Sequence, residues 1–301
     1  MKINIACLQM ASKPYDWDYN INKTTSMIRE AAENGAEICL LPEIFIPGYS
    51  LSYKNFEHAE SMDGKTINKI LDLAKELNIY ISGSIIEKLN EDFYNTMFLL
   101  GPQGILGTYH KKYVFGFEQK YWKRGNESTF INSKFGTIGL GICADMHYSD
   151  LWKQYSEKTN LILICSAWVD TSHIKISYAK HEFELCKTLP VKISKVLQVP
   201  TAYCNAAHEC TGFYSFMGTT KCGGFSKIIQ NGEIIASLDS GEEGIIHGKV
   251  DISKNFPVVD PSEFDNWIKY SLKEIIPKFV VEDIAGFLGR ISYRKYKKKY
   301  L

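Results

Sequence analysis

The feature that most constrains the fold is a series of short apolar segments that alternate with amphipathic stretches. Residues 161–165, Leu-Ile-Leu-Ile-Cys, are continuously apolar, which predicts a strand buried on both faces. Residues 37–42 predict another such strand, whereas residues 19–33 and 64–78 place apolar side chains at helical spacing. Strands that alternate with helices in this way predict an α/β fold.

The remaining elements complete one large domain. Further helices are expected at 148–157 and 173–196, and Pro190 should kink or divide the second one. A turn at 101–104 predicts that 93–100 and 105–111 pair in antiparallel fashion, and Asn231-Gly232 predicts a hairpin. Other strands are expected at 2–9, 79–87, 128–132, 136–142, 199–205, 224–230 and 233–238. We therefore expect a domain over residues 1–251 and a C-terminal extension over 252–301, with a basic end.

Composition excludes several classes of function. Lys and Arg number 35 against 34 Asp and Glu, a net charge of +1, which argues against a nucleic-acid partner. No apolar run is long enough to cross a bilayer, and the N-terminus is too polar for a signal segment, so we expect a cytoplasmic protein without membrane contact. The eight cysteines form no CxxC pair. This spacing argues against a metal site, and the expected cytoplasmic location argues against disulfides.

Cys143 is the strongest candidate for a chemical role. It ends the run Gly-Thr-Ile-Gly-Leu-Gly-Ile of residues 136–142 and is followed by a more polar segment. A cysteine between a strand and a helix can direct its sulfur out of the sheet edge, where the helix N-terminus favours a thiolate. The amide of Ala144 is then placed to stabilise an oxyanion. The plainer alternative is a buried, inert cysteine.

Three charged residues at or just beyond predicted strand ends could serve such a nucleophile. Glu43 follows the strand at 37–42, Lys111 ends the strand at 105–111, and Glu118 lies in an aromatic and basic stretch. Strand alternation places Lys111, rather than Lys112, on the face of Tyr109. Plainer explanations are a helix-capping or solvent-facing Glu43 and a surface ion pair for Glu118.

These motifs, in this order, resemble the Glu-Lys-Cys triad of the nitrilase, or carbon–nitrogen hydrolase, superfamily. The resemblance covers roughly residues 2 to 251. It includes the segments Leu41-Pro-Glu43, Tyr109-His-Lys111, Gly141-Ile-Cys143-Ala-Asp145, Ser166-Ala-Trp168, Tyr203-Cys-Asn205 and Gly224-Phe-Ser-Lys-Ile228. It implies a four-layer α-β-β-α sandwich that pairs as a homodimer or higher homo-oligomer, with residues 252–301 in the interface.

The resemblance also implies roles for the site residues. Glu43 would act as general base, Lys111 and the Ala144 amide would stabilise the oxyanion, and Glu118 would orient Lys111 or the substrate. The acyl group would pass through a thioester on Cys143, with no cofactor. Further residues expected to shape the pocket are Tyr49, Trp168 and His147.

Departures from the family pattern narrow the range of expected substrates. Nitrilases commonly carry Trp-Glu after the cysteine, whereas this chain has Ala144-Asp145, which favours an amide over a nitrile. The following Met146-His147-Tyr148 contains no arginine, so a largely uncharged small amide is expected rather than an anionic one. Two alternatives remain open. One is an acyltransferase or an ammonia-supplying glutaminase-type subunit with the same triad, and the other is a catalytically silent scaffold.

Overall fold

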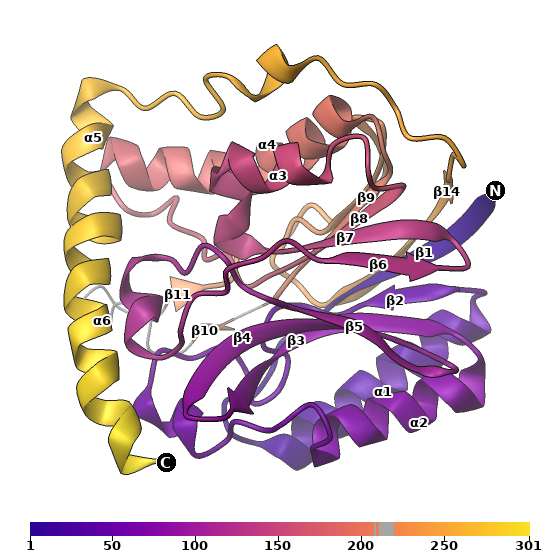
Figure 1. Ribbon diagram of the computed structural model, residues 1–301, viewed down its shortest axis with the longest axis horizontal. Helices are drawn as coiled ribbons and strands as arrows, with labels where there is room; N and C mark the ends of the chain where they lie inside the picture. Colours follow the sequence, from indigo (N-terminus) through magenta and orange to yellow (C-terminus); the bar gives the residue numbers. More distant parts are fainter. Residues whose placement is uncertain (208, 211–219) are drawn as a thin grey trace.

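Two six-stranded sheets stack face to face in the computed structural model, which describes residues 1–207, 209–210 and 220–301 (Figure 1). The first sheet has the order β14 (Gly244–Asp251), β1 (Lys2–Gln9), β2 (Ile38–Leu40), β3 (Tyr80–Leu89), β4 (Asp92–Gly101), β5 (Gly104–His110). The second has the order β13 (Glu233–Ser237), β12 (Lys227–Gln230), β9 (Thr201–Asn205), β8 (Leu161–Ser166), β7 (Gly136–Ile142), β6 (Phe130–Ser133). A short ribbon pairs β10 (Glu209–Cys210) with β11 (Thr220–Lys221).

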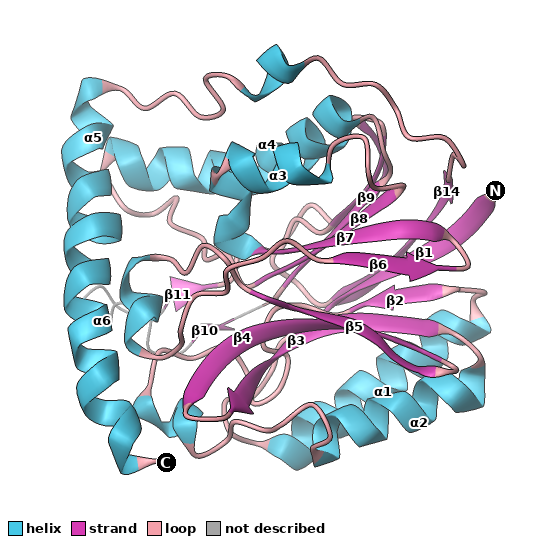
Figure 2. Cartoon of the chain, in the orientation of Figure 1, coloured by secondary structure: helices cyan, strands magenta, loops and turns pink. Residues whose placement is uncertain are grey.

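Helices cover the outer face of each sheet, which gives four layers (Figure 2). On the first sheet these are α1 (Trp17–Glu33) and α2 (Lys65–Leu77), and on the second they are α3 (Ser149–Tyr155) and α4 (Ser177–Leu197). Buried side chains such as Leu40, Leu140 and Tyr203 form one large core cluster, and Ile28 and Ile70 join another that includes strand residues of the first sheet. The α-β-β-α sandwich of the nitrilase type is therefore confirmed.

The direction of the strands brings the carboxyl ends of those that carry the candidate residues to one edge of each sheet. In the first sheet β1, β2 and β3 run parallel, and two antiparallel pairings turn β5 back into the direction of β2. In the second sheet β7, β8 and β9 run parallel. The carboxyl ends of β2 and β5, and those of β7 and β8, therefore lead into loops where α/β proteins place ligands.

Most expected elements are present, although β14 was not predicted and several bounds differ. The strand at 37–42 is shorter, Ile38–Leu40, and residues beyond it form a loop. Pro190 lies inside α4 without dividing it. The residues around Pro190 are largely buried against the second sheet, so packing offsets the hydrogen bond that proline cannot donate.

The C-terminal extension forms a long, nearly continuous helix that crosses the layers at one end of the sandwich, coloured yellow in Figure 1. It consists of α5 (Leu272–Lys278), a π-helical turn (Phe279–Ile284) and α6 (Ala285–Tyr296). Its inner side packs on the 3₁₀ turn η2 (Gly116–Lys120): a Cβ on Gly116 would lie 2.1 Å from the carbonyl oxygen of Val281. Among the described residues, the helices are too short or too polar to cross a membrane.

Candidate active site

Cys143 sits at a sharp turn held by a buried aspartate. Its φ of +45° lies in the left-handed region, which is uncommon for a residue other than glycine. One oxygen of Asp145 accepts hydrogen bonds from the Ile142 amide and the Tyr109 hydroxyl, both at 2.8 Å, and the other accepts from the Tyr113 amide at 2.8 Å. Burial raises the pKa of Asp145 to about 6. These bonds fix the backbone around the thiol.

Beneath the thiol, Lys111 is held between two carboxylates. Its Nζ lies 2.7 Å from Oε1 of Glu43 and 2.8 Å from Oε2 of Glu118, and all three residues are buried. Glu43 also accepts hydrogen bonds from the Asn95 side chain at 2.7 Å and from the Ala167 amide at 2.8 Å. Burial therefore argues against both a solvent-facing Glu43 and a surface ion pair for Glu118.

Glu118 is positioned by its own loop and by Tyr49. The Tyr49 hydroxyl donates to Oε1 at 2.7 Å, and the Phe115 amide donates to Oε2 at 2.9 Å. By contrast Lys112, the rejected alternative to Lys111, makes a partly exposed ion pair with Asp150. The site thus uses a lysine that has no access to water.

The buried charges determine the protonation state of the site. Burial raises the pKa of the Glu43 carboxyl, although Lys111 opposes this effect. Burial disfavours the charged form of Lys111, but the Glu118 and Glu43 carboxylates outweigh it and raise the lysine pKa well above its ordinary value. Burial, followed by the Glu43 carboxylate, raises the pKa of the Cys143 thiol well above its usual range. Burial and the two carboxylates therefore oppose the thiolate that the helix N-terminus was expected to favour.

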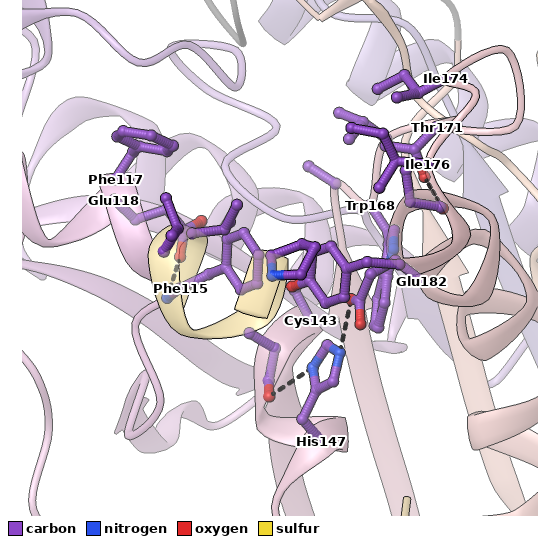
Figure 3. Close-up of a pocket in the computed structure, with 18 of the residues that line it drawn as sticks. Phe115, Phe117, Glu118, Cys143, His147, Trp168, Thr171, Ile174, Ile176 and Glu182 are labelled. Atoms are coloured by element: carbon purple, nitrogen blue, oxygen red, sulfur yellow. Dashed lines mark hydrogen bonds and ion pairs between the residues drawn. The ribbon is translucent and has the colours of Figure 1, made fainter. Parts of the chain in front are cut away.

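A cavity of about 330 Å³ opens over Cys143 (Figure 3). Its lining includes the predicted residues Tyr49, Ala144, His147 and Trp168, together with Glu118. Glu43 and Lys111 do not line the cavity. They lie behind its lining, where their charges act on the Cys143 thiol. The structure thus brings the predicted residues from separate parts of the sequence to one place.

Sequence reasoning missed Glu182 on α4. Its carboxylate lies 2.8 Å from Nε2 of His147 and accepts a hydrogen bond from the Tyr270 hydroxyl at 3.0 Å. Glu182 and Tyr178 are both buried on α4 and are one helical turn apart, on a face that continues with Cys186. An acidic residue on an otherwise apolar helical face was the signal that could have found it.

The cysteines require one correction. Cys7, Cys39, Cys143, Cys165, Cys186 and Cys204 are free, as expected. Cys222, however, is disulfide-bonded. The expectation of no disulfides, which rested on the expected location, is therefore wrong, and sequence spacing does not reveal which cysteines approach each other in the fold.

Among the described residues, no group of three or more His, Cys, Asp or Glu side chains is arranged to hold a metal ion. The acids, the lysine and the thiol are the reactive groups that the structure brings together at this site. A four-layer sandwich that places these groups beside a cavity has the architecture of an α/β enzyme with a thiol nucleophile. The chain belongs to the carbon-nitrogen hydrolase family, which it matches over residues 4–254.

Individual relatives agree with this assignment. Omega-amidase NIT2 from Homo sapiens is 29% identical over 259 residues, 82% of this chain and 87% of that protein. Omega-amidase NIT2-B from Xenopus laevis is 33% identical over a match that spans 54% of this chain and 62% of that protein. A probable nitrilase from Schizosaccharomyces pombe is 27% identical over 86% of this chain and 92% of that protein.

Solved structures share the fold. XC1258 from Xanthomonas campestris, described as a CN-hydrolase superfamily protein, has a TM-score of 0.71 at 21% identity and covers 84% of this chain and 91% of its own. A single-residue mutant of the amidase from Nesterenkonia sp. AN1 has a TM-score of 0.70 at 19% identity, and covers 84% of this chain and 94% of its own. That structure is described as showing Michael addition of acrylamide at the active site cysteine.

Proposed function

We propose that the protein is a thiol-dependent hydrolase that cleaves a non-peptide carbon–nitrogen bond of a small amide. The observation that carries this proposal is the buried contact of Lys111 with both Glu43 and Glu118 next to the Cys143 thiol. Two carboxylates and a lysine in a water-excluded site are costly for the fold unless they have a purpose. Catalysis by the thiol is that purpose.

In the first half of the reaction Glu43 takes the proton of the Cys143 thiol. The sulfur attacks the carbonyl carbon, and the oxyanion that forms is stabilised by Lys111 and by the amide of Ala144. Glu43 then returns the proton to the leaving nitrogen as the carbon–nitrogen bond breaks. Ammonia or an amine leaves, and the acyl group remains on Cys143 as a thioester.

In the second half, water replaces the amine. Glu43, again unprotonated, takes a proton from water as the oxygen attacks the thioester carbon. The carbon–sulfur bond breaks, the acid is released and the proton returns to the Cys143 sulfur. Glu118 holds Lys111 in place throughout, since its carboxylate is itself fixed by Tyr49 and the Phe115 amide.

An amide is the proposed substrate rather than a nitrile. The small Ala144 that lines the cavity beside the thiol leaves room on the side where nitrilases carry tryptophan. The relatives include proteins named as omega-amidases and others named as nitrilases, so identity alone does not decide between the two. An assay with both amides and nitriles distinguishes the two activities.

The test is ammonia release by wild type, Cys143→Ala and Glu43→Gln with a panel of amides and nitriles, combined with intact-mass detection of the acyl-enzyme. We expect Cys143-dependent release from amides and a mass adduct on Cys143. Release of the acyl group to added amines in preference to water would favour the acyltransferase alternative. Absence of turnover and of adducts with every compound would favour the scaffold.

We further propose a homodimer that uses the outward side of the C-terminal helix. Phe287, Leu288 and Ile291 are exposed there, on the side away from the sandwich. Three large apolar side chains along one helical face favour a protein contact. Sedimentation of wild type and Leu288→Glu would test this, and a dimer unchanged by the substitution would contradict it.

A further inference from the structure

The cavity over Cys143 is apolar on nearly all sides. Its walls include Phe115, Trp168, Val169 and Ile174, and Figure 3 shows the rings of Phe115 and Trp168 among the residues drawn around the thiol. An apolar group that enters such a space gains roughly 25 cal/mol for each Å² removed from water. A charge that enters it loses its hydration and needs a partner.

The ionisable groups at the cavity offer no partner for an anion. Glu118 is held by Lys111 and Tyr49, and Glu182 is paired with His147. Within the described chain, the lining contains no lysine and no arginine, and the cation that His147 can supply is already paired with Glu182. The positive charge of Lys111 is already contacted by two carboxylates, so a carboxylate on the substrate meets apolar groups, carboxylates and cations that are already paired.

One wall of the cavity comes from the C-terminal helix. Pro277, Val280 and Val281 line the cavity, although the match to the carbon-nitrogen hydrolase family ends at residue 254. This wall therefore lies outside the part of the chain that carries the catalytic motifs. It can differ between family members without any change in the triad.

The helix has a fixed place over the site. Gly116, in the turn that carries Glu118, approaches the Val281 carbonyl so closely that a methyl group would not fit. Glu282 accepts hydrogen bonds from the Tyr178 hydroxyl at 3.1 Å and from Lys278 at 2.8 Å. The wall is thus tied both to η2 and to α4, so its apolar side chains face the cavity in a defined position.

We propose that the C-terminal helix is a specificity wall that selects amides with an uncharged, apolar acyl group and rejects amides that carry a carboxylate. This proposal rests on the proposed hydrolysis at Cys143 and names its substrate class. The apolar acyl chain lies against Val280 and Val281, while the amide carbon reaches the thiol. An acyl chain that ends in a carboxylate would leave that charge buried without a cation.

The experiment compares kcat/KM for hexanamide with that for the monoamide of adipic acid, which has the same chain length and a terminal carboxylate. Wild type should prefer hexanamide by at least about a hundredfold, as expected for an unpaired charge in an apolar site. Val281→Lys supplies a cation and should reduce this preference at least about tenfold. Val280→Lys, at a half-exposed position, is the second variant should the first fail to fold.

The matched control is Ile276→Lys, on the same helix but 72% exposed and not part of the lining. It should keep the wild-type preference. Equal rates for the two amides, or a preference unchanged in both valine variants, would overturn the specificity wall while Cys143-dependent hydrolysis stands. No turnover of either amide or of smaller amides, with no adduct on Cys143, would instead overturn the proposed function.

Discussion

The floor and the walls of the cavity are built in opposite ways. Glu43, Lys111 and Glu118 form a charged floor beneath the cavity, and of the three only Glu118 reaches its lining. Each has two or more short polar contacts, and they come from segments just after β2, just after β5 and in η2. The walls are aliphatic and aromatic side chains from loops, α4 and the C-terminal helix. We infer from this contrast that catalysis depends on well-fixed polar contacts, whereas substrate selectivity depends on packing between distant parts of the chain.

The largest expected effect comes from removing the cation of the floor. Lys111→Met leaves two buried carboxylates without their partner, which should destabilise the fold by about 3–5 kcal/mol. It also removes the stabilisation of the oxyanion, so kcat should fall by at least about 10²–10³. Urea unfolding and ammonia release measure the two effects.

The neighbouring lysine is the matched control. Lys112 makes a partly exposed ion pair with Asp150, so Lys112→Met should change stability by less than about 1 kcal/mol and leave turnover near wild type. Equal effects of the two substitutions would contradict the distinction between a buried floor and a solvated surface.

The residues of the charged floor could be predicted from the sequence, whereas several residues of the walls could not. Glu43, Lys111 and Cys143 were predicted because each lies in a short local motif at or just beyond a strand end, and the strand pattern carried the α/β class. Glu182 and Val281 were not predicted, because their place at the cavity depends on how α4 and the C-terminal helix pack against the rest of the fold. The raised pKa of the Cys143 thiol could not be predicted from the local motif either, since it depends on burial and on charges from distant segments.

The second prediction concerns the turn that holds the nucleophile. Asp145→Ala removes the acceptor of three hydrogen bonds, which two amides and the Tyr109 hydroxyl donate. We expect a loss of about 2–4 kcal/mol in the free energy of unfolding and a large fall in kcat. Tyr109→Phe removes one of these donors and should cost about 1 kcal/mol. A smaller effect for Asp145→Ala than for Tyr109→Phe would show that the turn forms without the aspartate.

The third prediction tests whether the walls act on substrate choice. Gly116→Ala places a methyl group against the Val281 carbonyl and should shift the C-terminal helix, at a cost of about 1–3 kcal/mol. KM for hexanamide should rise more than KM for propionamide, since the shorter chain does not reach the wall. An equal rise of KM for hexanamide and for propionamide would show that the substitution acts through Glu118, which η2 also carries, and not through the wall.

The smallest expected effect concerns the polar pair in the wall, His147 and Glu182. Burial disfavours the charged imidazole, but the Glu182 carboxylate outweighs it, and the pKa of His147 is raised above its ordinary value of 6.5. The charged pair therefore stabilises the fold fully below the unfolded pKa of about 6.5. This contribution is lost as the pH rises through the higher folded pKa, where His147 becomes neutral.

Glu182→Gln should remove that pH dependence. At pH 6 the variant should be less stable than wild type by about 1–3 kcal/mol, and at pH 9 the gap should narrow because His147 is neutral in both proteins. Turnover of hexanamide should change by less than about tenfold, since the pair borders the cavity and does not hold the oxyanion. Urea unfolding at the two pH values measures the gap. A gap of the same size at both would show that His147 is neutral in the folded protein, and that the wall carries a hydrogen bond where we infer an ion pair.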